Sequence, residues 1–222
     1  MQHSWKKTSR NGLDVKKSYS HTESIESFLC LTHTNTVRVN SSKTDFELIE
    51  SAINGNEMSF AEIVRRHQSI VASTAMNMLG DMEEAKEVGQ MVFVRFYKSM
   101  AKFQNKAKLS TYLTRITINL CLNNLKRRQN FSSRTNSLDI AYGVSTGDKL
   151  TDYENKEIIN KALQMLDENH RAIVTVRMIQ GYDTLQTAEI LGIPKGTVLS
   201  RLKRAMDKLK IILINDFNYE YT

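Results

Sequence analysis

The chain has 222 residues, of which 41% are hydrophobic, and so carries enough apolar material for one large or two small packed cores. One proline and nine glycines are few for this length and favour a mostly helical protein, because proline breaks helix interiors. The formal net charge of +7 favours an anionic partner, either nucleic acid or acidic lipid.

The two cysteines, Cys30 and Cys121, form no CxxC pair and no cluster with histidines, which argues against a disulfide framework and against a zinc site. This pattern fits a reduced, cytoplasmic compartment. No apolar run of signal-peptide length follows Lys6 and Lys7, and no stretch of about 18 apolar residues could span a bilayer. We therefore expect a cytoplasmic protein with no membrane insertion, no metal and no cofactor.

Residues 1–43, rich in Ser, Thr, Asn and His, are expected to be a flexible extension, followed by a helical domain over 44–130. The stretches "TDFE" (44–47), "SFAE" (59–62) and "DMEE" (81–84) each match the capping-box pattern that begins a helix. Gly55 and Gly80 stand where helices should end. The predicted helices cover about 45–54, 60–79, 82–100 and 110–128.

Residues 131–151 are polar, contain two glycines and lack periodicity, which is typical of a linker. A second helical domain is predicted over 152–214, with helices near 152–166, 169–180, 183–191 and 195–213 and a tail over 215–222. Gly192 and Pro194 separate the last two helices, so a short helix, a tight turn and a longer basic helix form a helix-turn-helix pattern. The predicted fold class is all-α, with two small domains joined by a linker.

The last helix has two faces. Val198, Leu202, Ala205 and Leu209 share an apolar stripe that should pack on the preceding helices. From Lys195 to Lys210 there are six basic residues and one acidic residue, whereas a merely solvated helix usually mixes charges. Together with the preceding helix and turn, this division favours a DNA-binding helix.

The first domain contains a long stretch without acidic residues. Between Glu87 and Asp139 there are ten basic residues, interleaved with aromatic ones, a composition that suits single-stranded nucleic acid. Phe96 lies on an apolar stripe and is expected in the core. For Tyr112, base stacking and core packing both remain open. Just before this stretch, residues 81–91 carry four acids and one lysine, which indicates a surface for a protein partner beside the usual acidic preference of a helix start.

The order of these features resembles the extracytoplasmic-function (ECF) sigma factors of the sigma-70 family. The resemblance covers residues 45–130 and 155–212, most of the chain. It rests on three stretches in the expected order: "GDMEEAKEVGQMVFVRFYKSMAKF" (80–103), "STYLTRITINL" (110–120) and "ILGIPKGTVLSRLKRAMDKL" (190–209). They are similar to the family's region 2.2, region 2.3–2.4 and region 4.2.

The resemblance implies a non-enzymatic protein that binds core RNA polymerase, directs it to promoters and helps to melt the start region. An anti-sigma factor is a further partner that the resemblance makes plausible. The implied polymerase-binding residues are Glu84, Glu87 and Gln90. The implied contacts to the minus-ten element are Asn105, Lys106, Lys108, Tyr112, Asn119, Lys126, Arg127 and Arg128. The implied contacts to the minus-thirty-five element are Lys195, Thr197, Ser200, Arg201, Lys203 and Arg204.

The sequence departs from the family pattern at Lys86 and Gly89 in the acidic helix, at Thr187, and at Leu199, where a basic residue is usual. These departures leave open a sigma-like antagonist that binds polymerase without productive initiation. An ordinary helix-turn-helix regulator is a second alternative, although the helical first domain offers no α/β receiver. An enzyme is a third, but no phosphate loop, nucleophile motif or His partner for Glu83, Glu84 and Glu87 is present.

Overall fold

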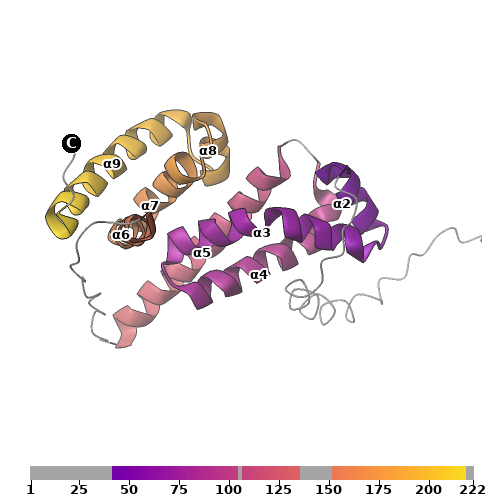
Figure 1. Ribbon diagram of the computed structural model, residues 1–222, viewed down its shortest axis with the longest axis horizontal. Helices are drawn as coiled ribbons and strands as arrows, with labels where there is room; N and C mark the ends of the chain where they lie inside the picture. The colour runs from indigo at the N-terminus through magenta and orange to yellow at the C-terminus, as the bar shows by residue number, and fades with distance from the viewer. Residues whose placement is uncertain (1–41, 105–106, 136–151, 219–222) are drawn as a thin grey trace, which may run out of the picture. The chain divides into compact units, whose positions relative to one another are not determined.

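Helices make up all the regular secondary structure in the part of the chain that the structure, a computed structural model, describes: residues 42–104, 107–135 and 152–218 (Figure 1). The N-terminal group comprises α2 (Asp45–Ile53), α3 (Glu57–Leu79), α4 (Met82–Ser99), the 3-10 turn η2 (Met100–Lys102) and α5 (Leu109–Thr135). The C-terminal group comprises α6 (Asp152–Gln164), α7 (Glu168–Val174), the π-helical turn η3 (Thr175–Ile179), α8 (Thr184–Leu191) and α9 (Lys195–Phe217). The predicted all-α class is confirmed.

The capping signals place two helix starts where the sequence predicts them. Thr44 and Glu47 form a full capping box, in which Glu47 Oε2 accepts from the Thr44 N–H at 2.6 Å. Asp81 caps α4 by accepting from the Glu84 N–H at 2.9 Å. Each cap satisfies a backbone donor that has no partner inside the helix.

The predicted start of α3 is wrong. The helix begins at Glu57, and its N-cap is Asn56, whose side chain accepts from the Ser59 N–H at 3.1 Å. Ser59 is already inside the helix, and its hydroxyl donates to Ser51 Oγ at 3.0 Å. Asparagine caps helices as well as serine does, and Glu62 takes arginine partners instead of the cap, so the "SFAE" pattern is not used.

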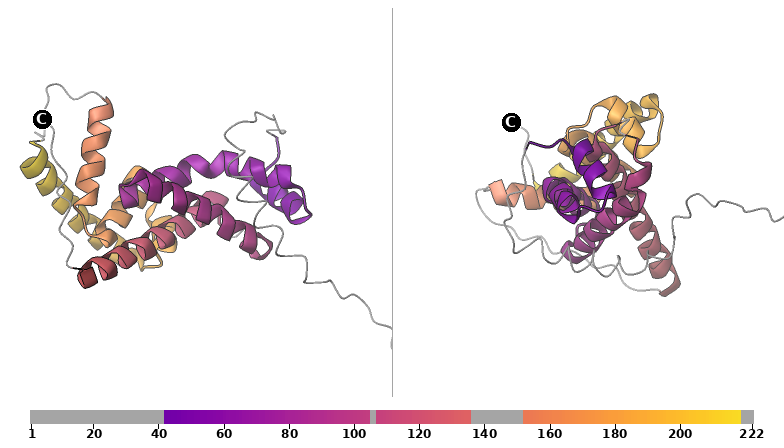
Figure 2. Two further views of the ribbon diagram at one scale, coloured as in Figure 1. Left: turned by 90° about the horizontal axis from the view of Figure 1, so that it is seen from below. Right: turned by 90° about the vertical axis from the view of Figure 1, so that its right-hand side faces the viewer.

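Three long helices of the N-terminal group pack side by side: α3 contacts α4 and α5, and α4 contacts α5 (Figure 2). Their facing stripes are buried, as the helical spacing predicts. The largest fully buried side chains of these helices are Ile63, Val71, Met78, Val92, Phe96, Leu113 and Ile118.

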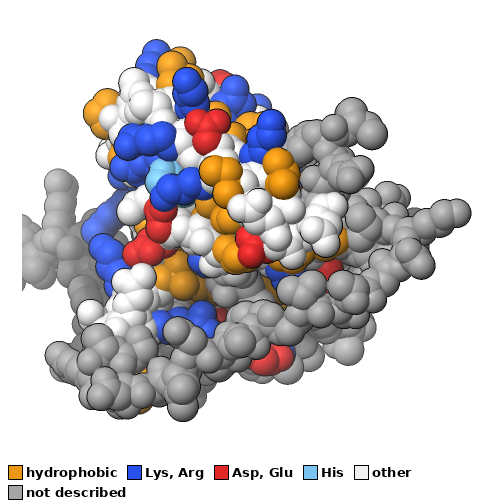
Figure 3. All heavy atoms as spheres, turned by 90° about the vertical axis from the view of Figure 1, so that its left-hand side faces the viewer, with side chains coloured by type: hydrophobic (Ala, Val, Ile, Leu, Met, Phe, Trp, Pro, Cys, Tyr) orange, Lys and Arg blue, Asp and Glu red, His pale blue; other side chains and the backbone are white. Residues whose placement is uncertain are grey.

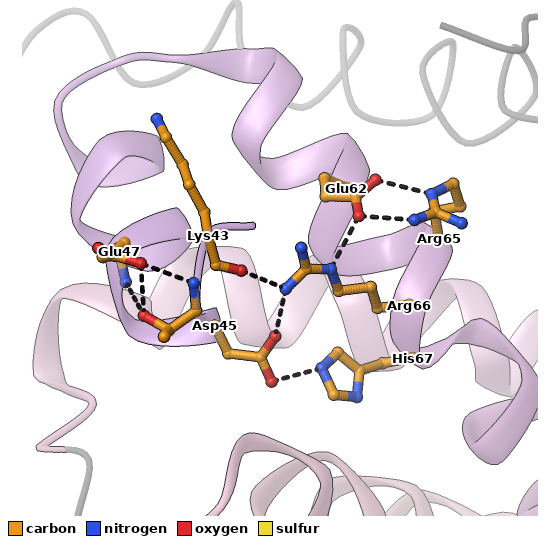
Figure 4. Close-up of polar contacts among 8 residues, drawn as sticks. Lys43, Asp45, Glu47, Glu62, Arg65, Arg66 and His67 are labelled. Atoms are coloured by element: carbon orange, nitrogen blue, oxygen red, sulfur yellow. Dashed lines mark hydrogen bonds and ion pairs between the residues drawn. The ribbon is translucent and has the colours of Figure 1, made fainter. Parts of the chain in front are cut away.

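A polar network joins α2 to α3 at one end of this group (Figure 4). Glu62, whose side chain is only 2% exposed, accepts from Arg65 and from Arg66. Arg66 also reaches Asp45 on α2 at 3.3 Å, and Asp45 pairs with His67 at 2.8 Å. The buried carboxylate is therefore fully compensated, and the network fixes the short helix on the long one.

The C-terminal group has its own apolar core. Leu163 and Ile173 from α6 and α7 meet Val198 and Ala205 from α9, all with 2% exposure or less. Leu202 packs on this cluster half-buried. The stripe predicted for the last helix is therefore the one that docks it.

Two helices are longer than predicted. The helix α5 continues to Thr135, into the segment expected to be a linker, and α9 continues to Phe217. Neither extension contains a glycine or proline that would stop the helix. The remainder of the expected linker, 136–151, and nearly all of the expected extension, 1–43, lie outside the described residues.

Residues of the C-terminal group cap the end of α3. Gly80 ends α3 in the left-handed conformation (φ 71°), which leaves carbonyl groups of the last turn without helical partners. The Met78 carbonyl accepts from Arg171 at 2.6 Å, and the Asn77 carbonyl accepts from Gln164 at 3.0 Å. A second contact joins α5 to the start of the helix-turn-helix, where the hydroxyls of Thr114 and Tyr182 lie 3.0 Å apart.

Candidate nucleic-acid and protein interfaces

The helix-turn-helix is built by caps at both sides of a short turn. Asp183 and Gln186 form a capping box at the start of α8, and Gly192 ends that helix in the left-handed conformation (φ 64°). Pro194, in an extended conformation, is the N-cap of α9. Because proline has no N–H to satisfy and a fixed φ, it suits this position. The turn thus sets the direction in which α9 leaves α8.

The polar face of α9 is open. Lys195, Ser200, Lys203 and Arg204 are exposed, while Thr197 and Arg201 are half-buried. Ser200 donates to the Thr197 carbonyl, and Arg204 donates to the Ser200 carbonyl at 3.2 Å. The structure therefore brings all six residues implied by the resemblance onto the part of α9 that does not dock.

Basic side chains also gather over the C-terminal helices on the face shown in Figure 3. One of the basic residues of α9 is engaged within the protein, since Lys208 donates to Asp167 at 3.1 Å. Asp167 is the N-cap of α7 and also pairs with His170. Although burial acts to raise it, the hydrogen bonds from His170 and Lys208 hold the pKa of Asp167 below its usual range. The hydrogen bond between Lys208 and Asp167 thus joins α9 to α7.

Three of the basic residues implied at the minus-ten element, Lys126, Arg127 and Arg128, lie on α5. Lys108 precedes the helix, and Asn119, Lys126 and Arg127 stand on it, all exposed. Between them, Thr111, Thr114 and Thr117 are buried with 4% exposure or less. One side of α5 is thus fixed in the protein and another is open to a ligand. Asn105 and Lys106 lie outside the described residues.

Tyr112 lies in an aromatic cluster. Its ring centroid is 5.2 Å from that of Phe103 and 6.2 Å from that of Phe96. Its hydroxyl is 3.3 Å from Ser99 Oγ, and the residue is half-buried. Phe96 is fully buried, as predicted. The Tyr112 ring therefore packs on the core with part of its surface left open.

The acidic helix α4 presents two of its three implied polymerase-binding residues to solvent. Glu87 and Gln90 are exposed. Glu84 is half-buried, and its Oε1 pairs with Arg128 of α5 at 3.2 Å. Its Oε2 is buried and has no hydrogen-bond partner among the described residues. The sequence places Glu84 and Arg128 on separate surfaces, but the structure pairs them, because α4 and α5 pack together.

Several features of the described residues bear on other classes of site. Burial raises the pKa of the Cys121 thiol to about 12, which makes it a poor nucleophile. Within residues 42–104, 107–135 and 152–218, no three His, Cys, Asp or Glu side chains gather as metal ligands would. None of the helices described, from α2 to α9, combines the length and apolar character needed to cross a bilayer.

Gly196 lies within the stretch 190–209 that carries the resemblance, but it is not among the implied contact residues. A side chain at Gly196 would meet no atom within 4 Å, so packing does not require glycine there. Only the structure shows that this position is open.

Comparison with known families gives two matches in the order of the two helical groups. Residues 63–131 match Sigma-70 region 2, and residues 156–209 match Sigma-70 region 4. The ECF RNA polymerase sigma factor SigM of Mycobacterium tuberculosis (strain ATCC 25618 / H37Rv) is 30% identical over 171 residues, which cover 77% of this chain and 85% of that protein. The ECF RNA polymerase sigma factor SigW of Bacillus subtilis (strain 168) is 26% identical over 173 residues, which cover 73% of this chain and 92% of SigW.

Solved structures share the fold. The sigma factor RpoE in complex with the anti-sigma factor NepR from Bartonella quintana superposes with a TM-score of 0.59 at 19% identity, covering 71% of this chain and 98% of RpoE. CnrH in complex with the cytosolic domain of CnrY superposes with a TM-score of 0.57 at 22% identity. The match covers 78% of this chain and 98% of the matched chain. With both sigma regions matched in order, and with a relative at this identity and coverage, the chain belongs to the ECF RNA polymerase sigma factors.

Proposed function

We propose that this chain is an initiation factor that binds core RNA polymerase and directs it to promoters through two separate DNA-binding surfaces. One is the exposed side of α5 with the loop before it, which takes the minus-ten element. The other is the polar face of α9, which reads the minus-thirty-five element. The observation that carries the proposal is that both surfaces are open and basic while the opposite side of each helix is buried.

The α9 surface is suited to duplex DNA. A helix that is docked by Val198, Ala205 and Leu209 can present its first turns to the major groove without losing its position. Lys195 supplies a phosphate contact whose strength depends on salt, and an arginine paired with guanine adds about 1–3 kcal/mol of discrimination. We assign base reading to Ser200, Arg201, Lys203 and Arg204, and backbone contact to Lys195 and Thr197.

The α5 surface is suited to a melted strand. Asn119 can hydrogen-bond a base edge, while Lys108, Lys126 and Arg127 lie open to phosphates. The partly open ring of Tyr112 offers a stacking surface worth on the order of 1–3 kcal/mol per base. Such capture offsets part of the few kcal/mol needed to unstack and flip a base.

The exposed acidic side of α4 is the polymerase-binding surface in this proposal, with Glu87 and Gln90 as direct contacts. Glu84 contributes through its pair with Arg128, which joins this surface to α5. Initiation by such a factor is a binding role without catalysis of its own, and it takes place in the cytoplasm. An anti-sigma factor that covers either surface would keep the chain inactive.

Two single substitutions test the two surfaces. Arg201→Ala should weaken binding of the holoenzyme to a minus-thirty-five duplex by about tenfold, the value of one lost base contact, and leave core binding unchanged. Asn119→Ala should reduce permanganate reactivity of the melted strand. Both are measured with holoenzyme assembled from core polymerase and the full chain. Equal loss of DNA and core binding by Arg201→Ala would refute the separation of surfaces.

The second candidate function is a sigma-like antagonist, and one observation supports it. Gly89 lies inside α4, where an added Cβ would meet Val71 at an ordinary 3.9 Å, so packing does not require it, and glycine weakens a helix by about 1 kcal/mol. Run-off transcription on genomic fragments separates the two functions. Core binding without any promoter-specific transcript would contradict the initiation factor and favour the antagonist.

A further inference from the structure

The exposed face of the first two turns of α9 contains an apolar residue among polar and basic ones. Gly196, Leu199, Ser200 and Lys203 follow the i, i+3, i+4, i+7 spacing of one helix face, and all four are exposed. The buried Val198 and Ala205 lie on the other side. Leu199 is 59% exposed and is therefore not part of the core.

The surroundings of Leu199 indicate what covers it. Lys195 and Lys203 stand one turn before and one turn after it, and both are exposed. In the proposed function, Lys195 contacts the DNA backbone and Lys203 contacts a base, so the Leu199 side chain between them faces the same groove. A protein partner with an apolar surface would have to bury these two charges, whereas DNA neutralises them.

Gly196 supports a close approach at the same face. A Cβ at this position would meet no protein atom within 4 Å, so packing within the described residues does not require glycine there. The space in front of Gly196 is therefore open to a ligand that comes close to the backbone. A groove wall or base pair beside Leu199 would use this space.

In the major groove, the methyl group at C5 of thymine is the apolar feature that distinguishes one base from the others. We propose that Leu199 reads a thymine in the minus-thirty-five element through contact with this methyl group. This inference rests on the proposed function of α9. The chain thus uses apolar contact at a position where a basic residue would select guanine. Leu199 is a specificity-determining residue.

The test uses holoenzyme made from core polymerase and the full chain, with a promoter library randomised across the minus-thirty-five region. Wild-type protein should enrich thymine at one position. Leu199→Ala should lose this enrichment, and Leu199→Arg should replace it with guanine. The matched control is Ile211→Ala, because Ile211 is 58% exposed on the same helix but three turns further along. It should keep the thymine.

A chemical substitution in the DNA then isolates the methyl group. Replacing that thymine with deoxyuridine should weaken wild-type binding roughly three- to fivefold, the value of about one buried methyl group, and should not affect Leu199→Ala. Thymine enrichment that survives in Leu199→Ala, or equal wild-type binding to both duplexes, would overturn the proposal. So would weaker core binding by Leu199→Ala with unchanged base preference, which would assign Leu199 to a protein contact.

These outcomes are distinct from failure of the proposed function. If wild-type holoenzyme initiated transcription but enriched no base at any position of the library, α9 would not read the minus-thirty-five element. Both the assignment of α9 and the role of Leu199 would then be wrong.

Discussion

Glu62 shows at the scale of one residue how a buried charge is kept in this protein. Arg65 binds its two carboxylate oxygens at 2.7 and 2.6 Å, and Arg66 adds a third hydrogen bond at 2.8 Å. The hydrogen bond from Arg65, opposed by burial and helped by Arg66, lowers the pKa of Glu62 to about 2. Because the pKa is lower in the folded than in the unfolded state, the carboxylate stabilises the fold above its unfolded pKa.

Glu62→Gln should therefore reduce the free energy of unfolding at pH 7 by on the order of 2–3 kcal/mol. The difference between wild type and variant should shrink as the pH falls from about 4.5 towards about 2, since wild-type Glu62 is then protonated as well. Urea unfolding at several pH values measures this. The control is Glu50→Gln on α2, an exposed carboxylate. A Glu62→Gln deficit that stayed constant with pH would contradict the role of the charge.

At the scale of elements, two helices end in the same way but in different surroundings. Gly80 and Gly192 both terminate helices in the left-handed conformation, with φ of 71° and 64°. A Cβ at Gly192 would meet nothing within 4 Å, whereas one at Gly80 would lie 2.6 Å from the Gln164 side chain. Gln164 is held by its bonds to Asn77 and Arg171 and cannot move away without losing them.

We expect Gly192→Ala to lower the free energy of unfolding by about 1–2 kcal/mol, the cost of a left-handed alanine. Gly80→Ala should lower it by about 1 kcal/mol more, because the Gln164 contacts are also lost. Thermal or urea unfolding of both variants gives the comparison. Adding Gln164→Ala to Gly80→Ala should recover part of the additional loss. Equal effects of the two glycine substitutions would mean that Gln164 does not restrain the end of α3.

Helix boundaries at this scale are only partly predictable from sequence. Thr44 and Asp81 were recognisable because each helix start is a local exchange of hydrogen bonds within four residues. The sequence predicts a start at Ser59 because Glu62 stands three residues after it, as in a capping box. In the structure Glu62 bonds to two arginines instead, and the helix starts earlier.

At the scale of the whole molecule, the contact between Thr114 and Tyr182 limits how far apart the two DNA-binding surfaces can be. The path from Asn119 to Arg201 runs along α5 to Thr114, across to Tyr182, and then through α8 and the turn into α9. Its total length is less than about 70 Å, which is the upper limit for the distance between the two residues. Elements named for positions minus ten and minus thirty-five are roughly 25 base pairs, or about 85 Å, apart. We therefore expect the contacts of Thr114 and Arg171 to the other helical group to open when the chain reads both elements.

A reversible crosslink tests this expectation. Ser73 and Gln180 come from the two groups, and Gln180 Nε2 donates to Ser73 Oγ at 3.1 Å. Ser73→Cys with Gln180→Cys, joined by a short bis-maleimide that contains a disulfide, should reduce transcription from a promoter with both elements by about tenfold or more. Reduction of the crosslinker should restore it. Cys30→Ser removes one of the two native cysteines, and the other, buried Cys121, should not react.

One outcome of the crosslinking experiment would contradict this expectation. Full promoter-dependent transcription by the crosslinked protein would mean that the two groups need not separate. The uncrosslinked double-cysteine protein, assayed in parallel, shows whether the substitutions alone change activity.

The sequence by itself determined the helical class, the order of the helices, the apolar stripes and the two basic surfaces. These follow from local rules: capping pairs, the spacing of residues such as Val198 and Leu202, and the sign of charge along the chain. The family could be recognised for the same reason, because each of its motifs is continuous in the sequence. The exposure of Lys203 and the burial of Val198 agree with these rules.

Only the tertiary structure decided which groups meet across the chain. It paired Glu84 with Arg128, placed Tyr112 against Phe103 and joined Arg171 to the end of α3. Each of these contacts depends on the angle and register at which two helices pack, and single-sequence periodicity does not contain that information. For the same reason, only the structure showed that Leu199 and Gly196 share an open face.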